Sequence, residues 1–320
     1  MNETTSASSK GRGAWLSALK NTENTKKEGS HIVLSVLSAL GLFLLSQFAS
    51  LFGFAGYIVY HIMKNKDVTQ SFHFEIGKNM FNQDVILIML FSDAVMILLF
   101  VLYAKYVEKR PIRTLGFTTK NMLLSYPAGI LGAALSMFAA ALFSVLTGAM
   151  TFSKGSLSLP YLLLFTIGWI IQGLAEEVMC RGFLMTSIAK RYSLTTAILV
   201  NSILFAILHV FNPSGLSVFA LINLFLYAVL ASLMFLYTKN IWLCAAFHTA
   251  WNMIQGNILG IPVSGIRVPS FFVIDANEHM PLLNGGPFGL EGSLPVTAVL
   301  LIGCILLFLL LRRKSAGGPK

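Results

Sequence analysis

One stretch of the sequence limits the possible folds more than any other: residues 192–238 contain no Asp, Glu, Lys or Arg over 47 positions. A bilayer core about 30 Å thick is crossed by a helix of about 20 apolar residues, so this stretch is long enough for two membrane spans. The sequence Asn212-Pro213-Ser214-Gly215 is a turn signal that divides it. The stretch therefore predicts an integral membrane protein.

The composition of the whole chain supports this prediction. Of its 320 residues, 56% are hydrophobic and 11% are charged, whereas a soluble domain has about 25% charged residues. This composition excludes an ordinary soluble enzyme and a disordered chain. The three cysteines, Cys180, Cys244 and Cys304, lie in apolar runs without a CxxC motif. We therefore expect buried small side chains and neither disulfides nor a zinc site.

Eight stretches are long and apolar enough to predict membrane helices. They are residues 32–60, 85–105, 122–150, 160–189, 194–211, 216–237, 240–260 and 294–311. The first stretch, which contains Gly53 and Gly56, and the fourth are the two in which we expect a break or an unusual length. The predicted fold is an all-α polytopic membrane helix bundle with about eight transmembrane helices.

The distribution of basic residues predicts the orientation of this bundle. If the N-terminus is cytoplasmic, the inside segments carry 18 Lys and Arg and the outside segments carry 5. Cytoplasmic loops of membrane proteins have such an excess, so we expect both termini inside, an N-in/C-in topology. The net charge of +10 then reflects loops that face an anionic membrane surface, and no nucleic acid partner is expected.

Three regions follow from this topology. Residues 1–30 are polar without an apolar period and predict a disordered cytoplasmic tail. Residues 31–314 form the predicted membrane domain, and 315–320 a short cytoplasmic tail. The longest outside connection, 261–293, is expected to be a structured or mobile external cap.

Few ionisable side chains lie inside the predicted spans. Such side chains are costly in lipid, so each of them suggests a functional role. They are Asp93, Glu176, Glu177, Arg181, His209 and His248, and Asn252 is a further strong polar group. We expect Asp93 to pair with Arg181 or a tyrosine in preference to lining a cavity, because buried charges are generally paired.

The fourth span contains two adjacent carboxylates with different surroundings. Glu177 and Arg181 are four residues apart and share a helix face, which favours an ion pair. Glu176 is rotated by about 100° from its neighbour, so we expect Glu177 to turn away to Arg181 while Glu176 stays free. A free carboxylate in a water-filled cavity can act as a general base. The alternative is that both residues pair with cations on other helices, although the other spans offer almost none.

Two further spans carry polar pairs at helical spacing. Phe205 and His209 are four residues apart, as are His248 and Asn252, so each pair shares one helix face. At a rise of about 1.5 Å per residue, these groups and Glu176 reach similar middle depths in their spans. The sequence therefore predicts one buried polar site that is formed by three helices.

The residues of this site form three motifs in a fixed order: Glu176-Glu177-x-x-x-Arg181, Phe205-x-x-x-His209 and His248-x-x-x-Asn252. Their order, spacing and placement on apolar helices resemble the signature of the CPBP family, the CAAX-protease and bacteriocin-processing (Abi) intramembrane proteases. The resemblance covers about residues 160–256, under a third of the chain. It implies an all-helical membrane bundle, often of eight spans, with a cavity that opens toward the cytosol.

The resemblance also implies roles for the motif residues. Glu176 would activate a water that His209 helps to orient, and His248 with Asn252 would form an oxyanion hole. The supporting residues would be Glu177 and Arg181, which hold the architecture, and Phe205, which packs beneath His209.

Members of this family are conventionally classed as metalloproteases, so a metal is an alternative. Glu176, His209 and His248 could hold a single divalent ion such as zinc with an open water position. The sequence has no H-E-x-x-H motif and no obvious second carboxylate to act as base. We therefore favour a mechanism without a cofactor.

The function expected from these features is that of an intramembrane endopeptidase. Its partners would be the lipid bilayer and a membrane-associated or lipidated peptide or protein that reaches the cavity from the cytoplasmic leaflet. The alternative is a non-catalytic bacteriocin-immunity or membrane scaffold protein of the same fold. A transporter is less consistent with the sequence, because no pair of Gly/Pro-interrupted spans recurs in two halves. The expected location is the cell membrane if the host is bacterial.

Overall fold

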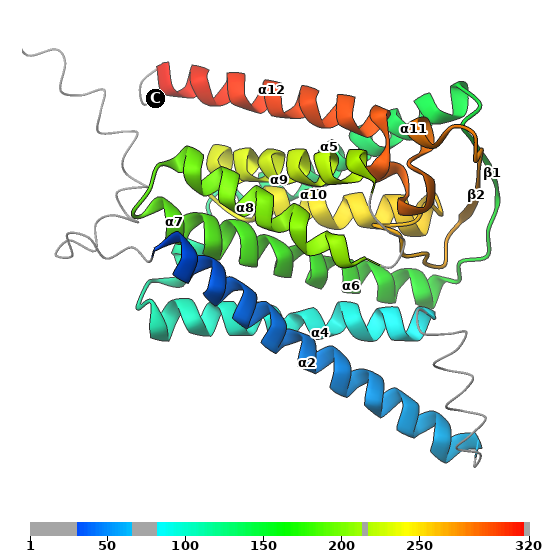
Figure 1. Ribbon diagram of the computed structural model, residues 1–320, viewed down its shortest axis with the longest axis horizontal. Helices are drawn as coiled ribbons and strands as arrows, with labels where there is room; N and C mark the ends of the chain where they lie inside the picture. The colour runs from blue at the N-terminus through cyan, green and yellow to red at the C-terminus, as the bar shows by residue number, and fades with distance from the viewer. Residues whose placement is uncertain (1–30, 66–81, 213–216, 317–320) are drawn as a thin grey trace, which may run out of the picture.

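A computed structural model describes residues 31–65, 82–212 and 217–316 of the chain. The predicted tail 1–30 and the last four residues of the predicted tail 315–320 lie outside this described part. The described part is an all-α bundle with one small sheet (Figure 1). Its main helices are α2 (Ile32–Asn65), α4 (Gln83–Leu102), α5 (Met122–Leu146), α6 (Leu159–Glu177), α7 (Thr186–Ala189), α8 (Leu194–Leu208), α9 (Val218–Thr238), α10 (Trp242–Met253) and α12 (Leu294–Ala316).

Wider π-helical turns extend three of these helices. They are Tyr103–Val107 after α4, Val178–Met185 between α6 and α7, and Ile254–Ile258 after α10. The π-helical segment after α6 joins it to α7 as one long element, Leu159–Ala189. The predicted fourth span is therefore unusually long and is not broken.

Seven helical elements in the described part are long and apolar enough to cross a membrane. They confirm a polytopic membrane bundle, and seven of the eight predicted stretches correspond to them. The eighth, predicted over 240–260, is α10 with its π-helical turn. It is shorter than the others, and every residue from Cys244 to Asn252 is buried. Protein packs around this stretch of the helix on all sides, so it is the central element of the bundle.

Two glycines explain how the helices pack. The first span is unusually long, which was one of the two expectations for it, because α2 continues through Gly53 over 34 residues without a break. A Cβ at Gly53 would lie 2.5 Å from the Ile88 side chain, so this glycine permits close contact with α4. A Cβ at Gly129 of α5 would lie 2.4 Å from the backbone oxygen of Leu243 in α10. Small residues at such crossings let membrane helices approach closely.

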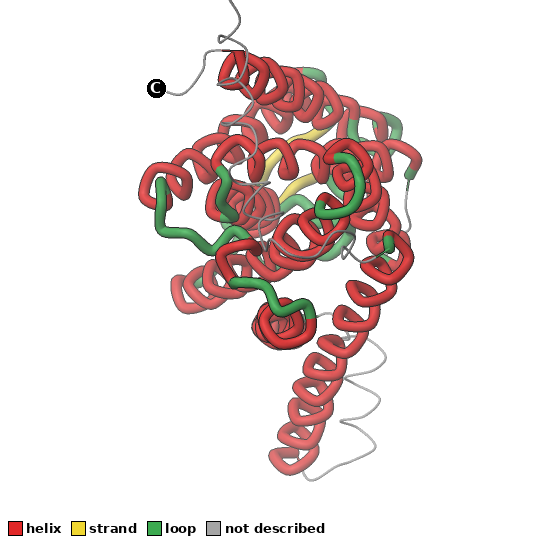
Figure 2. Tube along the Cα trace, turned by 90° about the vertical axis from the view of Figure 1, so that its left-hand side faces the viewer, coloured by secondary structure: helices red, strands yellow, loops and turns green. Residues whose placement is uncertain are grey.

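The C-terminal half of α2 is separate from the rest of the bundle. In both views it projects away from the other helices (Figures 1 and 2). Phe52 and Met63 in this half are each 76% exposed. Such apolar exposure is expected where a helix faces lipid hydrocarbon.

The two ends of the bundle differ in character. We call the end with the connections 108–121, 190–193 and 239–241 the basic end; α2 begins there and α12 ends there (left in Figure 1). We call the opposite end, with the connections 147–158 and 259–293, the loop end. Apart from α6 and α7, which form one element, consecutive main helices thus run in alternating directions between the two ends.

A small sheet covers part of the loop end. Strand β1 (Met150–Lys154) pairs antiparallel with β2 (Phe272–Ala276), with Thr151 opposite Asp275. The predicted third span extended to residue 150, but α5 ends at Leu146 because Thr147 and Gly148 turn the chain into β1. The connection 261–293 also contains the short helix α11 (Pro281–Asn284), so it is structured as expected.

The three cysteines are free thiols, as predicted. Cys180 and Cys244 are buried and Cys304 is partly buried.

Candidate active site

A cavity of about 250 Å³ lies inside the bundle. Helices α2, α4, α6, α8, α9, α10 and α12 contribute to its lining. The polar side chains that line it include the four predicted catalytic residues, Glu176, His209, His248 and Asn252, and also Asp93 and Gln172. The structure therefore brings Glu176, His209, His248 and Asn252 together in one cavity.

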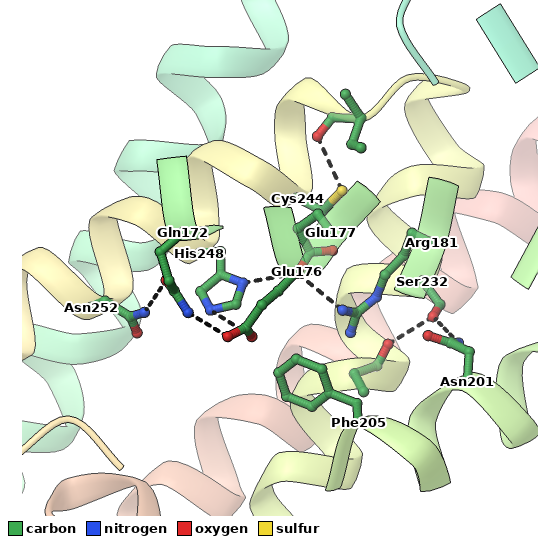
Figure 3. Close-up of polar contacts among 12 residues, drawn as sticks. Gln172, Glu176, Glu177, Arg181, Asn201, Phe205, Ser232, Cys244, His248 and Asn252 are labelled. Carbon is green, nitrogen blue, oxygen red and sulfur yellow. Dashed lines mark hydrogen bonds and ion pairs between the residues drawn. The ribbon is translucent and has the colours of Figure 1, made fainter. Parts of the chain in front are cut away.

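Glu176 lies near the end of α6 and faces this cavity. Its Oε1 accepts a 2.5 Å hydrogen bond from Nε2 of Gln172, one helical turn earlier. Its Oε2 lies 3.7 Å from Nε2 of His248 and has no hydrogen-bond partner among the described residues. Figure 3 shows the three side chains converging between α6 and α10. Catalytic hydrogen bonds are often long in an unliganded site, so this carboxylate oxygen is available for a substrate or water.

His248 lies between two carboxylates. Its Nδ1 is 3.0 Å from Oε1 of Glu177, while its Nε2 faces Glu176. A carboxylate only accepts, so Nδ1 carries the proton of this contact. Glu177 is absent from the cavity lining, in agreement with the expectation that it turns away to Arg181, but it also contacts His248, which was not expected. Two adjacent glutamates contact opposite nitrogens of the same ring, because the ring fits between their long side chains.

Glu177 also forms the predicted ion pair with Arg181. Nη1 of Arg181 donates to the same Oε1 at 3.0 Å, and both side chains are fully buried. The guanidinium carbon of Arg181 lies 4.9 Å from the ring centroid of Phe205. The Phe205 ring in turn lies 4.7 Å from the ring of His209. This layer of supporting residues therefore holds both histidines in position.

His209 lies where α8 ends and a 3-10 turn, His209–Phe211, begins. Its Nδ1 is 2.8 Å from the backbone oxygen of Phe205. A carbonyl oxygen cannot donate, so Nδ1 carries a proton and the Nε2 of the neutral ring is left as an acceptor. A neutral His209 can thus accept a hydrogen bond from a water in the cavity.

Asn252 lies one helical turn after His248 and also faces the cavity. Its Nδ2 donates to Oε1 of Gln172 at 3.0 Å. Gln172 therefore connects Asn252 to Glu176 by two hydrogen bonds. An amide nitrogen has two protons, so one N–H of Asn252 remains for a ligand.

Three features of the site differ from the sequence-based account or go beyond it. Asp93 lines the cavity, and Arg181, its expected partner, pairs with Glu177. Gln172 was not predicted as a site residue, although its position four residues before Glu176 on the same helix was a usable signal. Glu291 also lines the cavity from the loop end; it lies in a three-residue 3-10 turn, Leu290–Gly292, which has no helical period that could have given a signal.

Within the described ranges, no three His, Cys, Asp or Glu side chains are grouped so that they could hold a metal ion. The alternative ligand set of Glu176, His209 and His248 therefore does not fit this geometry. Glu176 and His248 approach each other to 3.7 Å, and the Nδ1 atoms of both histidines are bonded to protein acceptors, which leaves Nε2 as the other ring nitrogen of each.

The fold and the cavity define a class of protein: a polytopic helical membrane protein with a buried carboxylate and two histidines in one cavity. Residues 158–254 match the family described as "Rce1-like: Type II CAAX prenyl endopeptidase". This match supports the resemblance to the CPBP-family intramembrane proteases that the motifs indicate, and it covers less than half of the chain. It supports endopeptidase activity of the CAAX-protease type. No curated protein matches the chain.

Proposed function

We propose that this protein is an intramembrane endopeptidase that hydrolyses a peptide bond with a water activated by Glu176. The observation that carries the proposal is the placement of Glu176, His209 and His248 on one cavity, with Oε2 of Glu176 free of hydrogen bonds to the described residues. A scaffold or immunity protein would have no need of a free carboxylate beside two histidines inside a membrane, where such groups are costly.

The first step is proton transfer from the water to Glu176. A water between Oε2 of Glu176 and Nε2 of His209 would donate to both and point its remaining lone pair at the substrate carbonyl carbon. Attack by this oxygen forms the new C–O bond as the carbonyl double bond opens to an oxyanion. Glu176 then transfers the proton to the amine nitrogen, and the C–N bond breaks as the oxyanion collapses to the new carboxyl group. General acid–base catalysis by one positioned side chain contributes about 10²–10⁴-fold to such reactions.

The negative charge that develops on the substrate oxygen must be stabilised by hydrogen-bond donors. Asn252 has a free N–H. The Nδ1 proton of His248 is held by Glu177, so a second proton on Nε2 makes the ring an imidazolium that can donate to the substrate oxygen. The 3.0 Å contact to Glu177 and the 3.7 Å approach of Glu176 surround this ring with two carboxylates, which balance its positive charge. Such donors act on charge that develops in the transition state.

Replacing Asn252 with Ala should lower turnover more than binding. The lost N–H acts on the developing oxyanion, and removal of one such donor lowers kcat by about 10²–10³. The matched control is Thr249→Ala on the same helix, because Thr249 is buried and bonds to the Trp169 carbonyl. Steady-state kinetics of the two purified variants should separate kcat from KM; an unchanged kcat for Asn252→Ala would exclude the oxyanion role.

The proposed mechanism uses no cofactor, and it predicts activity that survives chelation. The purified protein, reconstituted in lipid vesicles, should release the same new peptide termini from a membrane-peptide extract before and after exhaustive dialysis against a chelator. Mass spectrometry of the new termini measures this. Complete loss of cleavage, with rescue by one equivalent of zinc, would instead support the metal alternative.

The proposed substrate is a membrane-associated or lipidated peptide or protein. The matched family description names a prenyl endopeptidase, which supports a lipidated substrate. The cavity supports a membrane-bound substrate of either kind, because it lies between helices that are long enough to span the bilayer. If the host is bacterial, the proposed location is the cell membrane.

A further inference from the structure

The cavity lies toward one end of the bundle. On α4 the cavity-lining residues begin with Ile86, three positions from the start of the helix at the loop end. On α9 they begin with Asn223, five positions from the helix start, and on α12 with Val296, two positions from it. Both of these helices also start at the loop end. The cavity therefore extends from Glu176 toward the loop end.

Residues of the loop-end connection form part of the cavity wall. Ser264 and Glu291 both line it and are joined to each other. The backbone N–H and the hydroxyl of Ser264 donate to Oε2 of Glu291 at 2.7 and 3.0 Å. Nε1 of Trp251 on α10 donates to the other oxygen of Glu291 at 3.2 Å. These contacts fix the connection around the loop-end side of the cavity.

The opposite side of the site is closed by packed protein. Every residue from Glu177 to Ala189 is buried. A Cβ at Gly182 would lie 2.8 Å from the backbone oxygen of Leu115, so the basic-end turn 112–115 packs directly on this segment. Arg110 also donates to Thr186 at 2.7 Å. Among the described cavity-lining residues, none belongs to the basic-end connections.

Charge assigns the two ends to the two sides of the membrane. In the described part, the Lys and Arg at or next to the basic end are Lys105, Lys109, Arg110, Arg113, Lys120, Lys190, Arg191, Lys239, Arg312, Arg313 and Lys314. Those on the loop-end side are Lys64, Lys154 and Arg267. An excess of Lys and Arg marks the cytoplasmic side of a membrane protein. The basic end is therefore cytoplasmic, and the cavity faces the other side.

We propose that the cavity receives its substrate from the non-cytoplasmic side of the membrane, as a peptide segment that is exposed on or has been carried across to that side. This proposal rests on the proposed peptidase function for the nature of the substrate. It differs from the cytosolic opening that the family resemblance implies, because the closed and basic side of the site is the cytoplasmic one.

Thiol labelling tests the direction of access without any cleavage. Met89 lines the cavity and has no hydrogen bond among the described contacts, so Met89→Cys introduces a reporter in the cavity wall. Lys154→Cys and Arg113→Cys are exposed reporters of the loop end and the basic end. The probe is a membrane-impermeant sulfonated maleimide, applied to intact bacterial cells that express the protein and to inverted membrane vesicles. The wild type, with three cysteines in apolar helices, gives the background.

We expect Met89→Cys and Lys154→Cys to react in intact cells and lose labelling in inverted vesicles, while Arg113→Cys shows the reverse. Labelling of Met89→Cys only in inverted vesicles, or from neither side, would overturn the proposal, as would an exchange of the two exposed reporters. Labelling needs no cleavage, so the same assay can also be run on the Glu176→Gln protein. The access route is thereby tested separately from the peptidase function. If labelling is as expected and the wild type cleaves nothing, the access route stands and the peptidase function fails.

Discussion

Glu177→Ala should prevent the accumulation of folded protein. The change removes the ion-pair partner of Arg181, whose side chain is fully buried and whose Nη1 donates to the lost carboxylate. An uncompensated buried charge of this kind costs about 3–5 kcal/mol. The free energy of unfolding of a typical folded protein is only about 5–15 kcal/mol, so the loss is a large part of it. Size-exclusion chromatography and thermal unfolding in detergent should show less protein and a lower Tm.

A double variant provides the control for this prediction. Glu177→Gln combined with Arg181→Met removes both charges and keeps most of the side-chain volume, so folded yield should recover relative to Glu177→Ala. Activity should stay low, because the carboxylate that holds Nδ1 of His248 is also gone. A Glu177→Ala protein as stable as the wild type would contradict the structural role of the pair. Full activity in the double variant would contradict the positioning of His248 by Glu177.

Much of the site could be predicted because helical geometry relates sequence spacing to direction. The four-residue spacings of Phe205 with His209 and of His248 with Asn252 place each pair on one face, and the structure has these residues as expected. The same rule would have identified Gln172, which is one turn before Glu176. Spacing fixes where each Cβ points, and in continuous helices this is enough to place the side chain.

Other contacts depend on information that spacing does not contain. Glu177 reaches His248 because a long side chain extends past the direction of its own Cβ, and the position of the ring depends on how α10 packs against α6. The pairing of β1 with β2 joins short segments that are distant in the sequence. Glu291 comes from a three-residue 3-10 turn in the loop-end connection and is placed by contacts with Ser264 and Trp251. These features result from tertiary packing, which has no local period.

Glu176→Gln should abolish cleavage and leave the fold intact. Glutamine keeps the shape of the side chain and can still contact Gln172, while it loses the ability to accept and return the proton of the water. The loss of a general base corresponds to a fall in turnover of about 10²–10⁴-fold. The thermal unfolding of the variant should match that of the wild type, since Glu176 has no ion pair with a Lys or Arg among the described residues.

The measurement that tests the peptidase account most directly compares peptide termini in membranes from cells with equal amounts of wild-type and Glu176→Gln protein. Thr249→Ser, a small change on α10 outside the cavity lining, serves as the control variant. The account predicts a set of new peptide termini that appears with the wild type and with Thr249→Ser and is missing with Glu176→Gln. The same new termini at the same levels in all three samples would contradict it.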